Sequence, residues 1–114
     1  MAQPRMTIQT LEVLSSMLDD CYREWYGLEL STASGLKTGT IYPVLVRLEQ
    51  AGWVSSYWEE VDPSVVGRPR RRLYRLTGEG ADAARAAVDA QLQRLAKASS
   101  PQRGRIVRPE GRTI

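Results

Sequence analysis

Residues 37–50, KTGTIYPVLVRLEQ, are the most informative part of the sequence for the fold, because they combine two different faces on one predicted helix. Apolar residues recur in it at the spacing of three and four that places them on one side of a helix, and they are Ile41, Val44, Leu45 and Leu48. We predict that this side packs into a core, that Thr38 is the N-cap and that Gly52 ends the helix. The opposite side combines polar and basic residues with Pro43 and Val46, which is unusual for a solvent-facing surface.

Two further helices are predicted before this stretch. The first begins at Thr7, a suitable N-cap, and its wide apolar face is formed by Leu11, Leu14, Met17, Leu18 and Cys21. The second is short, covers about 25–34 and ends at Gly35. Its candidate buried residues are Tyr26, Leu28 and Leu30. Together with the helix at 38–50, the short helix predicts a helix-turn-helix pair joined around Gly35-Leu36.

After Gly52 the apolar pattern changes from the period of a helix to that of a strand. Residues 53–61 are rich in aromatic and β-branched residues, 62–69 contain turn-forming residues, and 71–76 read as a returning strand. The predicted hairpin carries five arginines with no acid among them: Arg68, Arg70, Arg71, Arg72 and Arg75.

A last helix is predicted over 77–98, with Thr77 as its cap. Its apolar residues follow coiled-coil spacing and are Ala81, Ala84, Val88, Leu92 and Leu95. The predicted fold class is α+β, mainly α: a winged helix-turn-helix with a C-terminal dimerisation helix. The predicted organisation is a flexible arm over 1–6, a DNA-binding domain over 7–76, a dimerisation helix over 77–98 and a basic, disordered tail over 99–114.

The charge of the chain is unevenly distributed. Its net charge of +3 equals that of residues 99–114 alone, which hold four arginines and one glutamate. Arginine, which dominates the basic residues, is well suited to phosphate and guanine. A basic run is often only a solvated surface, but here it coincides with the hairpin of a helix-turn-helix protein. We therefore predict double-stranded DNA as the partner.

In this geometry the helix at 38–50 enters the major groove by its N-terminal part. The residues predicted to contact DNA there are Lys37, Thr38, Gly39, Thr40, Tyr42, Pro43, Val46 and Arg47. The wing residues predicted to contact phosphates or a narrow minor groove are Arg68, Arg70 and Arg71. Val46 fits a thymine methyl group, and packing against the wing or neutral exposure is an equally good interpretation.

The composition excludes several classes of function. The chain has no His and a single Cys, Cys21, so a Ser-His or Cys-His nucleophile pair, an internal disulfide and a Cys/His metal site cannot be built. We expect no catalytic residue, no metal and no cofactor. Cys21 is interpreted as a small buried hydrophobe, with a redox sensor as the alternative. No apolar run reaches the length of a membrane span and no signal peptide opens the chain, so a cytoplasmic location is expected.

Several motifs resemble the PadR family of bacterial transcriptional regulators. They are Tyr26-Gly27-Leu28-Glu29-Leu30, Gly35 to Leu45, Arg47-Leu48-Glu49, Gly52-Trp53-Val54, Gly67 to Arg71 and Tyr74 to Thr77 with Gly80. The resemblance covers about residues 7–95. It implies a homodimer that binds a palindromic operator, usually as a repressor. Such a cytoplasmic protein is expected on the nucleoid when it is bound to DNA.

The same resemblance implies that the first and last helices build the dimer. The residues assigned to it are Leu11, Leu14, Met17, Leu18, Val88, Leu92 and Leu95. A single helix after the wing is typical of the short members of the family. Some of these bind flat aromatic drugs against a Trp of the last helix, but no aromatic residue lies between Ala81 and Ala98 here. A small-molecule effector of unknown identity is included among the expected partners.

Three alternatives from other classes remain open. A protein-adaptor winged helix predicts a wing poor in arginine and acids on the recognition face, and neither is seen between Lys37 and Arg47 or in the wing. An RNA-binding winged helix predicts exposed aromatic residues, for which Tyr42, Tyr57 and Trp58 are candidates. A Glu-based hydrolase has no supporting constellation of residues.

Overall fold

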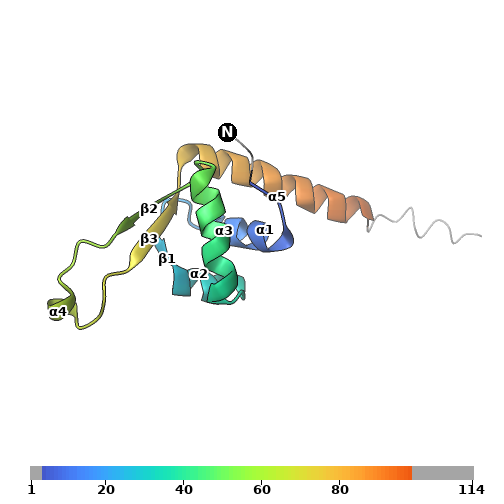
Figure 1. Cartoon of the computed structure of the whole chain (residues 1–114). Helices are drawn as coiled ribbons and strands as arrows, with labels where there is room; N and C mark the ends of the chain where they lie inside the picture. Colours follow the sequence, from blue (N-terminus) through green and yellow to red (C-terminus); the bar gives the residue numbers. More distant parts are fainter. Residues whose placement is uncertain (1–3, 99–114) are drawn as a thin grey trace, which may run out of the picture.

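The computed structural model describes residues 4–98 and contains five helices and three short strands in that range (Figure 1). The helices are α1 (Ile8–Leu18), α2 (Gly27–Ser34), α3 (Thr38–Gln50), α4 (Pro63–Val66) and α5 (Gly78–Ala98). The strands are β1 (Trp25–Tyr26), β2 (Val54–Trp58) and β3 (Arg72–Leu76), and they form an antiparallel sheet in the order β1-β3-β2. This is a winged helix-turn-helix fold, as the sequence predicted.

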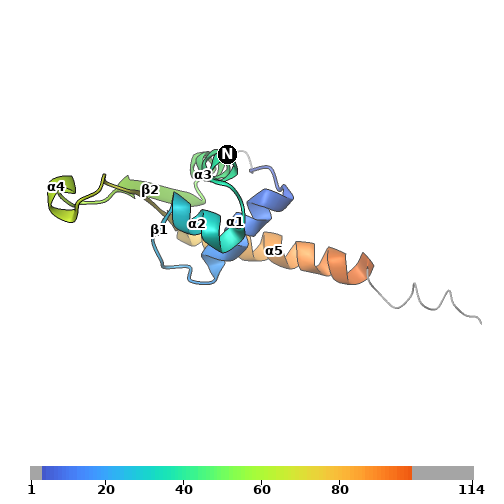
Figure 2. The ribbon, with the colours of Figure 1, turned by 90° about the horizontal axis from the view of Figure 1, so that it is seen from below.

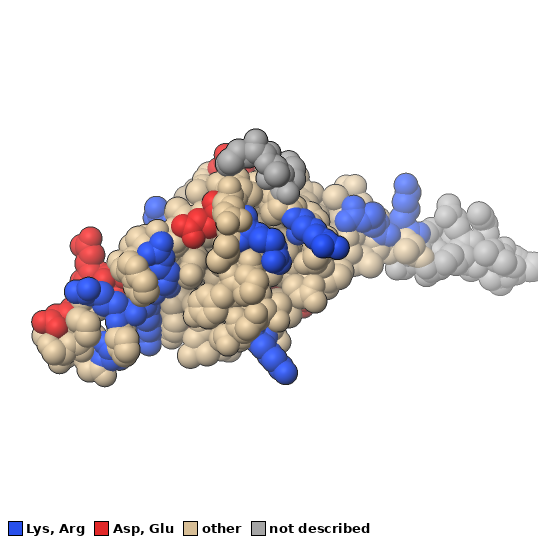
Figure 3. Space-filling model, in the orientation of Figure 1, with Lys and Arg blue, Asp and Glu red and all other residues tan. Residues whose placement is uncertain are grey.

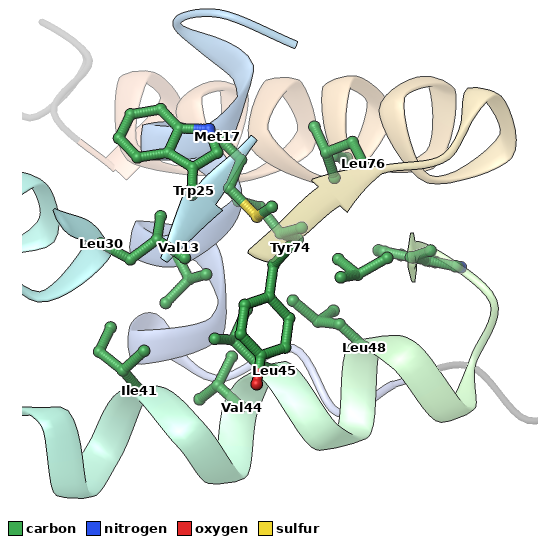
Figure 4. Close-up of a cluster of buried hydrophobic side chains, with 14 of the residues drawn as sticks. Val13, Met17, Trp25, Leu30, Ile41, Val44, Leu45, Leu48, Tyr74 and Leu76 are labelled. Atoms are coloured by element: carbon green, nitrogen blue, oxygen red, sulfur yellow. The ribbon is translucent and has the colours of Figure 1, made fainter. Parts of the chain in front are cut away.

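The core lies where α1, α2, α3, the sheet and the start of α5 meet (Figure 4). All four residues predicted for the inner face of α3 are buried: Ile41, Val44, Leu45 and Leu48. They pack with Val13, Leu14 and Met17 of α1, with Leu30 of α2 and with Tyr74 and Leu76 of β3. The apolar period therefore identified the buried side of the third helix correctly.

Local capping fixes the ends of most helices. Thr7 caps α1 by accepting from the Thr10 amide at 3.1 Å, and the Thr77 hydroxyl accepts from the Gly80 amide at 2.9 Å in the first turn of α5. Gly35 ends α2 with a φ of 78°, as predicted. The prediction for Thr38 was wrong, because Lys37 is the N-cap of α3 and no side chain caps that helix.

The predicted second helix begins too early. Trp25 and Tyr26 form the strand β1, which pairs with Tyr74 and Leu73 of β3. The pairing partner lies far away along the chain, so local periodicity could not reveal it. The prediction of a buried Leu28 was also wrong, since this side chain is 58% exposed, whereas Leu30 is fully buried.

The wing is a hairpin with a longer tip than the strand pattern indicated. β2 and β3 pair from Val54 opposite Leu76 to Trp58 opposite Arg72. Between them, the four-residue helix α4 begins after Asp62, whose carboxylate accepts from the Ser64 amide at 2.9 Å. The strands are therefore shorter than the predicted 53–61 and 71–76.

The β2–β3 hairpin and α5 extend from the body in opposite directions in both views (Figures 1 and 2). Only the first turns of α5 are buried, through Gly80, Ala81 and Ala84. Leu92 and Leu95 are 58% and 53% exposed. The helix therefore presents apolar side chains beyond the body of its own chain.

The residues of α1 that were assigned to the dimer are mostly buried within one chain. Leu14 and Met17 are fully buried within one chain, and Leu11 is 8% exposed, because α1 packs its apolar face on α3, α2 and α5. Leu14 and Met17 therefore belong to the core of a single chain, and the dimer contacts assigned to the residues of α1 stay a prediction. Leu18 and Val88 are half-buried.

Other predictions fall partly outside the described range. The predicted tail at 99–114 and residues 1–3 of the predicted arm lie outside the described residues, and Pro4 is buried. Cys21 is half-buried beside the core, with the Arg85 Nη2 at 3.7 Å from its Sγ, and its role stays a prediction. Within residues 4–98, no helix is long and apolar enough to cross a membrane, and no cluster of His, Cys, Asp or Glu could hold a metal ion.

Candidate nucleic-acid interface

The outer face of α3 is open, as a helix that enters a DNA groove requires. Of the eight predicted DNA contacts on and just before α3, Thr40 is half-buried, and the exposed ones are Lys37, Thr38, Gly39, Tyr42, Pro43, Val46 and Arg47. Tyr42 is 44% exposed and Val46 51% exposed. Because no side chain caps this helix, its first backbone amides are not engaged by a cap and suit a phosphate.

The carboxylate of Glu59 connects the two sides of the wing. Its two oxygens accept from the guanidinium of Arg68 at 2.6 and 3.1 Å, and Oε1 also accepts from the Arg71 amide at 2.9 Å. The Glu59 amide in turn donates to the Arg71 carbonyl oxygen at 2.9 Å. The Arg68 side-chain hydrogen bond and the Arg71 amide lower the pKa of Glu59 to about 2. Sequence reasoning missed Glu59, although an acid across the predicted hairpin from an arginine run was a usable signal.

The predicted wing arginines therefore differ in what they can offer to DNA. Arg68 is engaged with Glu59, and Arg70 is exposed and donates from Nε to the Val61 carbonyl oxygen at 2.9 Å. Arg71 lies over the ring of Tyr26, with its Cζ 4.0 Å from the ring centroid. Arg72, which the sequence analysis did not assign, lies over Trp58 at 5.3 Å.

A chain of hydrogen bonds connects the wing to α3. Arg72 donates from Nε to the Ser56 Oγ at 3.1 Å, and the Ser56 hydroxyl donates to the Glu49 carboxylate at 2.7 Å. Glu49 belongs to the last turn of α3, so these two hydrogen bonds hold the wing in place relative to α3. The sequence analysis did not identify Ser56 or Glu49 as residues that connect the wing with α3. A hydrogen bond between two elements leaves no periodic pattern in the sequence.

A groove of about 490 Å³ lies between α3 and the wing. It is lined by the rings of Tyr26, Tyr42, Trp58 and Tyr74, by Gly27 and by the three consecutive arginines 70–72. The structure thus brings Tyr42 and Arg71, predicted separately as contacts of helix and wing, to one surface. Tyr26, Gly27, Arg72 and Tyr74 were missed as parts of that surface.

Basic side chains are spread over this part of the molecule (Figure 3). Acidic side chains gather at the far end of the wing in the same view, and the sequence between the two strands there contains Glu59, Glu60 and Asp62. The far end of the wing therefore carries both signs of charge, whereas β2 and β3 carry Arg72 and Arg75 and no acid.

The comparisons with known proteins agree with this geometry. The sequence profile of the transcriptional regulator PadR-like family matches residues 18–86. The structure of smu.1704 from Streptococcus mutans UA159 is 26% identical over 96% of this chain and 100% of that chain, with a TM-score of 0.66. A PadR family transcription regulator from hypervirulent Clostridium difficile R20291 is 27% identical over 84% of this chain and 97% of that chain, with a TM-score of 0.63.

More distant structures share the fold alone. Bordetella bronchiseptica BpsR is 19% identical with a TM-score of 0.57; the matched part covers 77% of this chain but only 58% of BpsR. No curated protein matches the chain. The profile and the solved structures confirm the resemblance inferred from the sequence, and these proteins are regulators and not enzymes. Since the profile spans more than half of its residues, the chain belongs to the PadR-like family of transcriptional regulators.

Proposed function

We propose that the protein is a homodimeric repressor that binds a palindromic operator, with α3 in the major groove and the wing against the flanking backbone. The observation that carries this proposal is the open outer face of α3 beside an arginine-lined groove of the wing. A recognition helix reads base edges, while contacts to phosphates fix its position. Both kinds of contact are available on the same side of this chain.

The homodimer rests on α5. Its half-buried Val88 and its exposed Leu92 and Leu95 follow one stripe on the part of the helix that extends beyond the body. An apolar stripe of this kind is costly in water and suits the same stripe of a second copy. Two copies joined in this way carry two recognition helices, which matches the two half-sites of a palindrome.

The proposal also includes a cytoplasmic location, association with the nucleoid when DNA is bound, and a small-molecule effector of unknown identity. The effector is supported by proteins of similar fold, since DNA binding by BpsR is regulated by 6-hydroxynicotinic acid. That regulator shares only 19% identity, so its ligand is not assigned to this chain.

Selection of bound sequences from a random duplex pool, followed by footprinting, tests the proposal. We expect enrichment of one motif with two inverted half-sites, protected by a dimer. Arg47→Ala should lose discrimination against random DNA, whereas Arg94→Ala, which removes the same charge from exposed α5, should keep it. A pool without an enriched motif, or stronger binding to structured RNA than to duplex DNA, would overturn the proposal.

A further inference from the structure

A pocket of about 440 Å³ lies at the junction of β3 and α5. Figure 1 shows that this wing strand leads directly into the helix. The walls of the junction pocket come from the turn after α1, from β2 and β3 and from the first two turns of α5, which contribute Cys21, Ser55 and Ala81 among others. Its volume lies in the range of small-ligand sites.

Two side chains that can donate hydrogen bonds stand next to each other in this pocket. Ser55 of β2 and Arg75 of β3 are directly opposite partners in the antiparallel sheet, so they share one of its faces. Both residues are exposed, and neither side chain forms a hydrogen bond or an ion pair with any residue between 4 and 98. The hydroxyl and the guanidinium are therefore both available to one ligand.

The charges that line the pocket favour a ligand with one negative charge. Among the described residues, the charged ones in the lining are Arg75, Arg85 and Asp82. Arg85 donates from Nη1 to the Asp82 carboxylate at 3.2 Å, so these two charges balance each other. The positive charge of Arg75 is left over. A guanidinium matches a carboxylate through two parallel hydrogen bonds.

The floor of the junction pocket is apolar and aliphatic. Leu76 and Ala81 line it and are 5% and 9% exposed, and Cys21 is half-buried beside them. Tyr22 provides the single ring in the lining, and because this side chain is 86% exposed it offers no enclosed stacking surface. A short aliphatic chain attached to the anionic group would cover this floor, and burial of its methylene groups would favour binding.

We propose that the junction pocket binds a short-chain aliphatic monocarboxylate. Its carboxylate accepts from the Arg75 guanidinium and the Ser55 hydroxyl, and its chain covers Leu76 and Ala81. A ligand here contacts both the wing and the helix that carries the proposed dimer stripe, so it would fix the wing relative to α5. The inference gives the proposed effector a site and a chemical class, and its consequence for DNA binding rests on the proposed function.

Calorimetry without DNA is the first test, with hexanoate as the probe. Acetate has the same carboxylate without the chain, and hexanamide has the same chain without the charge. Each of these should bind about tenfold more weakly than hexanoate, or worse. Absence of hexanoate binding, or equal binding of hexanamide, would overturn the proposal. Tighter binding of inorganic phosphate than of hexanoate would overturn the assignment to a carboxylate.

Variants of Arg75 locate the binding site. Arg75→Ala should weaken hexanoate binding about tenfold, and Arg75→Lys should retain part of the affinity. Arg94→Ala removes the same charge from α5 outside the pocket and should bind as the wild type does. Because Arg75 and Arg94 are both exposed, we expect all three variants to fold, which thermal melts check. Equal hexanoate affinity of the wild type and Arg75→Ala would overturn the proposed site.

The single cysteine of the chain supplies an independent reporter, because Cys21 lines this pocket. Saturating hexanoate should slow the alkylation of Cys21 by iodoacetamide, measured by mass spectrometry, in the wild type. The same concentration should have no effect on Arg75→Ala. Binding of hexanoate that leaves the alkylation rate of the wild type unchanged would place the ligand elsewhere and overturn the proposal.

Operator titrations with and without hexanoate test the regulatory consequence. Saturating hexanoate should change the operator affinity of the wild type by about fivefold or more and leave that of Arg75→Ala unchanged. Binding of hexanoate without such a change would overturn the effector role. The proposed function fails by a different result, namely the absence of an enriched operator motif in selections without hexanoate.

Discussion

Glu59 and Arg68 form an ion pair of 2.6 Å that holds the two sides of the wing together beyond the last strand pair. The same carboxylate accepts from the Arg71 amide, so both sides of the loop are fixed at one point. Arg68 therefore stabilises the wing in the free protein, and the groove arginines are presented from a constrained loop.

The titration of Glu59 gives the first prediction. Its pKa is about 2 in the folded chain against an ordinary value of 4.5, so the stabilisation of the wing is complete above pH 4.5 and is lost as the pH falls to about 2. The amide resonance of Arg71, which donates to this carboxylate, should titrate near pH 2 in NMR spectra. Glu59→Gln should abolish that titration. A midpoint near pH 4.5 in the wild type would contradict the ion pair.

A second prediction separates a structural from a direct role of Arg68. Arg68→Ala leaves Glu59 unpaired next to DNA, so affinity should fall about twofold to fivefold, as for a partly exposed pair. The double variant Glu59→Gln/Arg68→Ala also removes the negative charge that Arg68→Ala leaves unpaired. Its DNA affinity should therefore be higher than that of Arg68→Ala. Anisotropy titrations measure both. No recovery in the double variant would indicate that Arg68 itself contacts phosphate.

Gly80 provides a test of how the start of α5 packs against the residue that precedes β2. A Cβ atom at this position would lie 1.9 Å from the Trp53 carbonyl oxygen, which is backbone and cannot move aside easily. Gly80→Ala should therefore destabilise the fold by about 1–3 kcal/mol. Gly78→Ala is the matched control, because a Cβ atom there meets nothing within 4 Å, and its melting temperature should stay the same or rise. Equal melting temperatures of the two variants would refute the predicted clash.

The proposed dimer depends on the far end of α5. Leu92→Glu/Leu95→Glu should give a folded monomer, because both side chains are more than half exposed in the single chain. Operator affinity should fall strongly, because a monomer has lost the DNA-binding domain of the second subunit. Multi-angle light scattering measures the mass, and Gln93→Glu, an exposed change on the same helix, should remain dimeric. A dimeric double variant would place the interface elsewhere.

The outer face of α3 is expected to carry base discrimination. Thr40→Ala and Arg47→Ala should each reduce the preference for operator over random DNA by about 1–3 kcal/mol if the side chain touches a base. Competition titrations with the two duplexes measure the preference. An unchanged ratio for both variants would mean that specificity arises from other residues or from DNA shape.

The features of the molecule that depend on local chemistry could be predicted from the sequence. The helical spacing from Ile41 to Leu48 identified the buried side of α3, and Thr7, Gly35 and Thr77 marked the ends of helices through bonds or φ angles within a few residues. The exposed side of α3 followed from the same period. Such signals are readable because both partners lie within one or two turns of the chain.

Features that depend on residues far apart in the sequence could not be predicted from local patterns and became visible in the folded chain. The strand at Trp25-Tyr26 exists because β3 offers it a partner, and Leu14 and Met17 are core residues because the other helices and the sheet close over them. The wing arginines look equivalent in sequence, yet Glu59 engages Arg68 while Tyr26 and Trp58 hold Arg71 and Arg72. Periodicity shows which side of an element is apolar, but which side chains meet across elements is set by how those elements pack.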